Sequence, residues 1–81
     1  MNYELAIMAL EGLSSSPMRV EVGERGIEIR GSGSSFKELA RLCLLLGNEA
    51  TDEGETVHLQ VPVHLAEGSL ELRLRRSSSE P

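Results

Sequence analysis

The two histidines are the first residues in this chain whose chemistry could form a site. His58 and His64 are six positions apart, with Glu67 shortly after them. A zinc site needs three or four ligands that converge on one point. Six residues of straight strand would separate the histidines by roughly 20 Å, so only a bend after Pro62 would bring them closer. We therefore expect one surface histidine, one turn histidine, and no metal or other cofactor.

A glycine- and serine-rich segment is the second candidate, and its residues are Gly31, Ser32, Gly33, Ser34 and Ser35. It leads from an expected strand into an expected helix, where free backbone N–H groups and the helix dipole favour anions. The segment lacks both the Gly-Lys-Ser/Thr ending of a P-loop and the last glycine of a dinucleotide fingerprint. A small anion could bind these five residues. A flexible connection that ends in a helix cap would explain the same sequence.

Four acidic residues, Glu49, Asp52, Glu53 and Glu55, follow the expected helix with no base between them. A calcium loop needs regularly alternating oxygen ligands closed by a bidentate glutamate, and this stretch has no such pattern. A solvated loop is the simplest interpretation. The alternative is an acidic rim that binds a protein partner, with these four residues and His58 as its candidate contacts.

Catalytic groupings are not evident in the sequence. Cys43 lies among leucines with no histidine near it, which is typical of a buried and unreactive thiol. The serines have no G-x-S-x-G context. We therefore expect a protein that is not an enzyme.

Composition narrows the class of protein further. Thirteen acidic and eight basic residues give the 81-residue chain a net charge of −5. Nucleic-acid binders normally carry a basic stripe with aromatics, so the charge argues against that class and suits solubility or a basic protein partner. One cysteine permits no internal disulfide and favours the cytoplasm. The apolar run Leu5 to Leu10 is too short for a membrane span and lacks the preceding basic residues of a signal peptide.

Alternating apolar and charged residues predict four strands. Residues 18–22 and 26–30 form a hairpin, with Gly23 and Gly26 around its turn. Residues 56–63 and 69–75 alternate in the same way. Because proline cannot donate to a ladder, Pro62 either places the first of these two strands at a sheet edge or limits its pairing to residues up to Val61.

Residues 35–46 predict a helix between the two pairs of strands. Ser35 and Glu38 fit a capping box, and Gly47 is typical of a helix end. One stripe at helical spacing is expected to cover the sheet, and it comprises Phe36, Leu39, Ala40, Cys43 and Leu46.

Residues 3–13 permit two interpretations. Their composition favours a helix, with Leu5, Met8 and Ala9 on one face. The alternation of apolar residues in the same segment also permits a strand. We expect the helix.

Together these elements predict a single α+β domain over residues 1–76 and a disordered tail at 77–81. The expected fold has two layers: a four-stranded, mostly antiparallel sheet (β-β-α-β-β along the chain), covered on one face by the 35–46 helix, with an additional N-terminal helix.

Some apolar residues exceed what one sheet face can cover, namely Leu5, Ile7, Met8, Leu10, Leu13, Leu44 and Leu45. We therefore expect a homodimer, through the helical side in preference to a free sheet edge.

Three segments resemble small bacterial immunity proteins of polymorphic toxin systems. They are Ile27-Glu28-Ile29-Arg30-Gly31-Ser32, the leucine-rich helix after it, and Val57-His58-Leu59. The resemblance covers residues 18–75 and implies a cytoplasmic, non-enzymatic protein that binds and blocks a cognate toxin. Of the individual residues, it draws attention to His58 alone.

The sequence thus supports two hypotheses about function. The first is a protein-binding module, with toxin neutralisation as its most concrete form. The second is a small self-associating regulatory domain that binds an anion at the Gly31–Ser35 segment. A toxin gene immediately upstream would favour the first.

Overall fold

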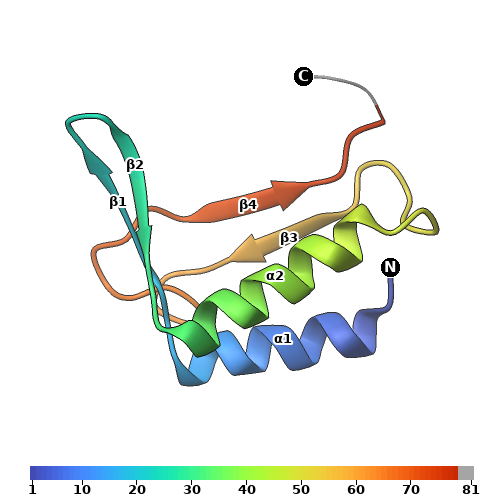
Figure 1. Cartoon of the computed structure of the whole chain (residues 1–81), viewed down its shortest axis with the longest axis horizontal. Coiled ribbons are helices and arrows are strands. Elements are labelled where there is room, and N and C mark those ends of the chain that lie inside the picture. Colours follow the sequence, from blue (N-terminus) through green and yellow to red (C-terminus); the bar gives the residue numbers. More distant parts are fainter. Residues whose placement is uncertain (79–81) are drawn as a thin grey trace.

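The computed structural model describes residues 1–78 of the chain and confirms the α+β class and the N-terminal helix. Two helices and four strands follow one another (Figure 1): α1 (Tyr3–Ser15), β1 (Arg19–Gly23), β2 (Gly26–Arg30), α2 (Gly33–Gly47), β3 (Thr56–Leu59) and β4 (Leu72–Arg75). Residues 79–81 of the predicted tail lie outside the described residues. Ser78, in the described part of that tail, donates a hydrogen bond to Glu53 at 2.8 Å.

The predicted single four-stranded sheet is wrong. β1 pairs only with β2 and β3 pairs only with β4, giving two separate antiparallel ladders. The chain between β3 and β4 connects the two ladders. It runs alongside β1, where Met18 and Leu65 form an isolated parallel bridge. Two further backbone bonds hold it there, from the Ala66 N–H to the Met18 carbonyl at 2.7 Å and from the Leu70 N–H to the Val20 carbonyl at 2.8 Å.

A turn explains why these pairings do not merge into one sheet. The Ser69 N–H bonds to the Ala66 carbonyl, and Gly68 between them has a φ of +86°, which glycine adopts without steric cost. The turn interrupts the ladder: Ala66 before it and Leu70 after it each bond to β1 or its entry, and the chain pairs with β3 only from Leu72 onward. Both predicted C-terminal strands are accordingly shorter than expected, at Thr56–Leu59 and Leu72–Arg75.

The helices pack side by side and antiparallel, next to β3 and β4 (Figure 1). Small residues on α1 allow the close approach, because Ala6 and Ala9 are buried and Gly12 faces Glu38. A Cβ atom at Gly12 would lie 2.6 Å from a Glu38 carboxylate oxygen. Leu5 and Met8, which we placed on one helical face with Ala9, are exposed, whereas Ala9 is buried.

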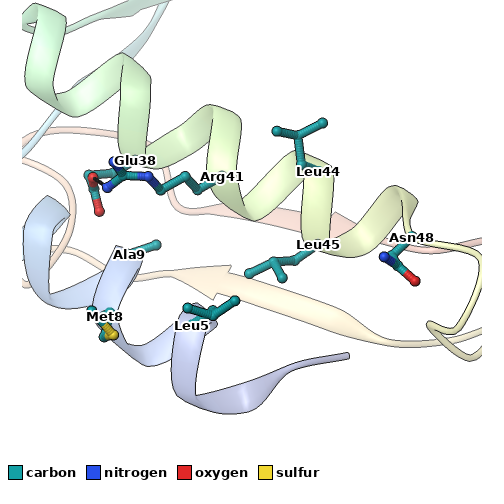
Figure 2. A pocket seen from close by; sticks show the side chains of 8 residues that line it. All are labelled: Leu5, Met8, Ala9, Glu38, Arg41, Leu44, Leu45 and Asn48. Atoms are coloured by element: carbon teal, nitrogen blue, oxygen red, sulfur yellow. Dashed lines mark hydrogen bonds and ion pairs between the residues drawn. The ribbon is translucent and has the colours of Figure 1, made fainter.

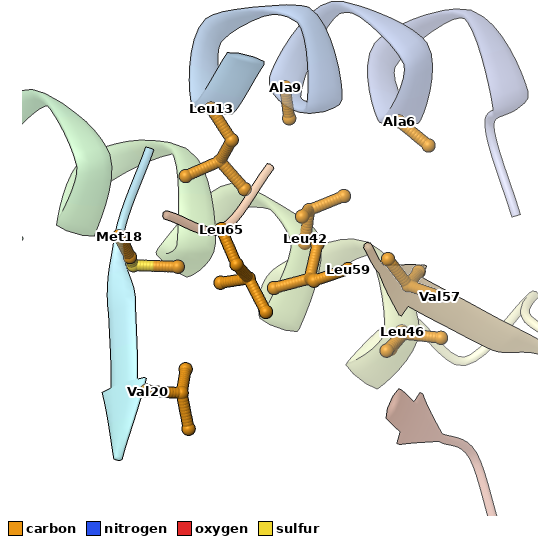
Figure 3. Packing of buried hydrophobic residues seen from close by; sticks show 10 residues of the cluster. All are labelled: Ala6, Ala9, Leu13, Met18, Val20, Leu42, Leu46, Val57, Leu59 and Leu65. Atoms are coloured by element: carbon orange, nitrogen blue, oxygen red, sulfur yellow. The ribbon is translucent and has the colours of Figure 1, made fainter. Parts of the chain in front are cut away.

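The core forms where both helices meet β1 and β3 (Figure 3), and its buried members are Ala6, Ala9, Leu13, Met18, Val20, Leu42, Leu46, Val57, Leu59 and Leu65. On α2 the predicted stripe is wrong in most positions, since Phe36, Ala40 and Cys43 are exposed whereas Leu42 is fully buried. Leucines at 42, 44, 45 and 46 occupy several faces of the helix. Periodicity alone therefore did not single out the face that α1 and the strands cover.

Candidate partner-binding surface

A groove of about 560 Å³ runs between α1 and α2. Figure 2 shows the residues that line it: Leu5, Met8, Ala9, Glu38, Arg41, Leu44, Leu45 and Asn48. Ala9 and the half-buried Leu45 belong to its deeper part, and Leu45 points toward Leu5. The centre of the groove is therefore apolar.

The apolar rim of this groove is unusual because its large side chains are exposed to solvent and its small ones are buried. Met8 is 63% exposed and Leu44 is 74% exposed, whereas Ala9 is 2% exposed. Exposed apolar residues scattered singly are normal on proteins, but contiguous ones that line a hollow mark interaction surfaces. Sequence reasoning had identified Leu5, Met8, Leu44 and Leu45 as apolar excess and expected them at a homodimer interface. It did not predict that they line a groove between α1 and α2.

The two ends of the groove differ in charge. At one end, Glu38 and Arg41 form an ion pair, one turn apart on α2. At the other end, Leu45 and Asn48 also line a second hollow of about 290 Å³, which opens beside Met1 and Thr51. The groove thus leads from the ion pair toward the acidic loop at residues 48–55.

Hydrogen bonds fix the acidic loop to the C-terminal end of α2. Thr51 is buried, and its hydroxyl donates to the Leu45 carbonyl at 2.7 Å. Arg76 donates to the carbonyl oxygens of Leu46 and Asn48. The loop also bonds to the chain after β4, since the Gly54 N–H donates to the Arg76 carbonyl at 2.9 Å. This anchoring leaves three of the predicted contact residues exposed, namely Glu49, Asp52 and Glu53.

Glu55, the fourth acidic residue, lies against α1. Its carboxylate accepts a hydrogen bond from the hydroxyl of Tyr3. That hydrogen bond, the negative charge of Glu55, partial desolvation and the more distant charge of Asp52 together raise the pKa of Tyr3 above its ordinary value of 10.0. The N-terminal end of α1 and the acidic loop therefore lie together at one end of the molecule (Figure 1).

The ionisation of Tyr3 tests this arrangement, because Tyr3 is the only tyrosine in the chain. In an alkaline absorbance titration we expect a midpoint above 10, which Glu55→Gln should shift back toward 10. A raised pKa stabilises the fold below the ordinary pKa and ceases to do so as pH rises through the folded value. Glu49→Gln is the control and should leave the midpoint unchanged. Equal midpoints in wild type and Glu55→Gln would contradict the contact.

His58, which we grouped with the acidic loop, pairs with Glu71 instead. It belongs to β3, and its Nε2 lies 2.5 Å from a carboxylate oxygen of Glu71. His64 accepts a hydrogen bond at Nδ1 from the Gln60 N–H at 3.1 Å. Its pKa is lowered by partial burial and then by the charge of His58, so the turn after β3 brings the two histidines within electrostatic range. Within residues 1–78 no three metal-ligating side chains gather in one place.

Two of the three serine hydroxyl groups in the candidate anion segment, those of Ser32 and Ser35, form hydrogen bonds within the protein. Ser32, not Ser35, caps α2, because its Oγ accepts from the Ser35 N–H at 3.1 Å. Ser35 is fully buried and donates to the Ser16 carbonyl at 2.6 Å. The predicted capping box is therefore wrong, and Glu38 pairs with Arg41 instead. Anion binding at Gly31–Ser35 stays a prediction, to which this geometry adds no support.

Comparison with protein-family models, curated proteins and solved structures finds no match to this chain. Within the described residues, neither helix has the length and apolar character needed to cross a membrane. Cys43, which we expected to be buried, is exposed on α2.

Proposed function

We propose that this chain is a non-enzymatic protein-binding module that takes a segment of another protein into the α1–α2 groove. The observation that supports this proposal most is the apolar rim: Met8 and Leu44 are exposed beside a hollow large enough for side chains of a partner. Burial of such side chains on binding contributes roughly 25 cal/mol per Å² of apolar surface.

The occupant that fits best is an amphipathic segment with apolar side chains along one face and Lys or Arg at one end. Its apolar face would cover Leu5, Met8 and Leu44. Its basic end would lie over the acidic loop, where Glu49 and Asp52 are exposed. Opposite charges of this kind steer association and fix the orientation of the bound segment.

Neutralisation of a toxin in the cytoplasm is the form of this function that the immunity-protein resemblance suggests. The single cysteine and the net charge of −5 are compatible with that setting and with a basic partner. Inhibition would need no chemistry from this chain, since covering a functional surface of the partner suffices.

Co-expression with the polypeptide encoded immediately upstream provides the test. We expect that polypeptide to arrest growth of a bacterial host, and co-expression of this chain to restore it. Leu44→Glu should abolish the protection and weaken the purified complex at least about tenfold in calorimetry, because an unpaired charge would face the apolar segment. The fold should be unaffected, since Leu44 is 74% exposed.

Val63→Glu is the matched control: Val63 is also an exposed apolar residue, but it does not line the groove. This variant should protect as well as wild type. An upstream product that does not inhibit growth would contradict the toxin-neutralising form. Protection that Leu44→Glu leaves intact would contradict the groove as the binding surface.

A further inference from the structure

β2 is an edge strand: among residues 1–78 it pairs with β1 on one side and with no strand on its outer side. Met18, just before β1, and Val20, within β1, form backbone hydrogen bonds with the 64–70 segment. The backbone N–H and C=O groups of these even-numbered residues therefore point away from β2. The odd-numbered residues of β1 then bond to β2, where Glu21 pairs with Glu28 and Arg19 pairs with Arg30. Because bonding alternates along a strand, Ile27 and Ile29 direct their N–H and C=O groups outward.

The hairpin also projects beyond the core, as Figure 1 shows. Val22 and Ile27 face each other across the two strands, and they are 69% and 65% exposed. The opposite face of the hairpin is charged, with Arg30 paired to both Glu21 and Glu28. An exposed strand edge beside an apolar pair is a template on which another strand can add.

We propose that a second copy of this chain pairs with β2 along this edge, in an antiparallel arrangement about a two-fold axis at Ile29. The N–H and C=O of Ile29 would then bond to those of Ile29 in the second copy, and Ile27 would lie opposite Gly31. Glu28 would face Arg30 of the second copy, and Arg30 would face Glu28. The two hairpins would join into one four-stranded sheet.

The charges of Glu28 and Arg30 favour this register over the two neighbouring ones in which the outward-pointing backbone groups also form hydrogen bonds. An axis at Glu28 would place the two Glu28 carboxylates directly opposite each other, which is destabilising. An axis at Arg30 would place the two Arg30 side chains directly opposite each other, which is destabilising for the same reason. Among residues of β2, only the axis at Ile29 gives two complementary cross-strand pairs. A strand of unrelated sequence would lack this self-complementarity, so a second copy is the occupant that the edge fits.

Exchange of the two charges provides a decisive test by sedimentation velocity. Wild type should sediment at twice the 8.8 kDa mass of the chain at micromolar concentration. Glu28→Arg and Arg30→Glu should each raise the dimer dissociation constant about tenfold or more, because both symmetric contacts become like-charged. An equimolar mixture of the two variants should dimerise again, since the two arginines on β2 of the first variant then lie opposite the two glutamates on β2 of the second.

Amide hydrogen exchange of the wild-type protein gives a second measurement that needs no variant. The amides of Ile27 and Ile29 should be protected, and the protection should fall on dilution. A wild type that stays monomeric into the millimolar range would overturn the proposal. So would a dimer that both charge variants leave intact, or one that Leu44→Glu dissolves. None of these measurements involves the groove partner, so their failure would leave the proposed function standing.

Discussion

Replacing Leu42 by alanine is expected to lower the free energy of unfolding by about 2–5 kcal/mol. Leu42 is 0% exposed and belongs to the cluster that joins α2 to α1 and β3. The substitution removes buried methyl groups and leaves a cavity that the tightly packed helices cannot fill. Native domains are stable by only about 5–15 kcal/mol, so a chain of 81 residues would lose much of its margin.

Leu44→Ala is the matched control, two residues further along the same helix and 74% exposed. Its free energy of unfolding should lie within about 0.5 kcal/mol of wild type. Urea denaturation followed by circular dichroism measures both variants under the same conditions. Equal losses at the two positions would mean that α2 turns a different face to the core.

Gly31→Ala is expected to cost about 1–3 kcal/mol, although it adds a single methyl group. The added Cβ would lie 2.9 Å from Cγ of Met18 and 3.1 Å from Cβ of Ser35. Both neighbours are fully buried, and Ser35 is held by its hydrogen bond to Ser16. Neither can move aside without disturbing the junction between β1 and the start of α2.

Gly33→Ala provides the comparison, because Gly33 is the first residue of α2 and a Cβ there would meet nothing within 4 Å. Alanine is also a better helix former, so this variant should be as stable as wild type or more stable, by up to about 1 kcal/mol. Gly31→Ala should therefore unfold at a lower temperature than wild type, and Gly33→Ala should not. A Gly31→Ala protein as stable as Gly33→Ala would show that the crowding around Gly31 is absent in solution.

The candidate site was predictable only in part. The acidic residues of the 49–55 stretch were identified from sequence, and the structure leaves Glu49, Asp52 and Glu53 exposed in the loop that follows Asn48 at one end of the groove. His58 was grouped with them, but its contact is with Glu71, next to β4. The groove itself was not predicted, because it depends on how α1 lies against α2.

Local sequence determined the secondary structure of this protein. Alternation at 18–30 specified the hairpin, and leucine-rich composition specified α2, because these signals act between residues close in the chain. Tertiary structure decided which faces are buried and which strands meet. Ala6, Ala9 and Gly12 let α1 approach α2 closely, which turned Leu5 and Met8 outward, and the turn at Gly68 split the expected sheet into two ladders. Both outcomes depend on contacts between distant segments, and a leucine-rich helix offers several equivalent faces until such contacts select one.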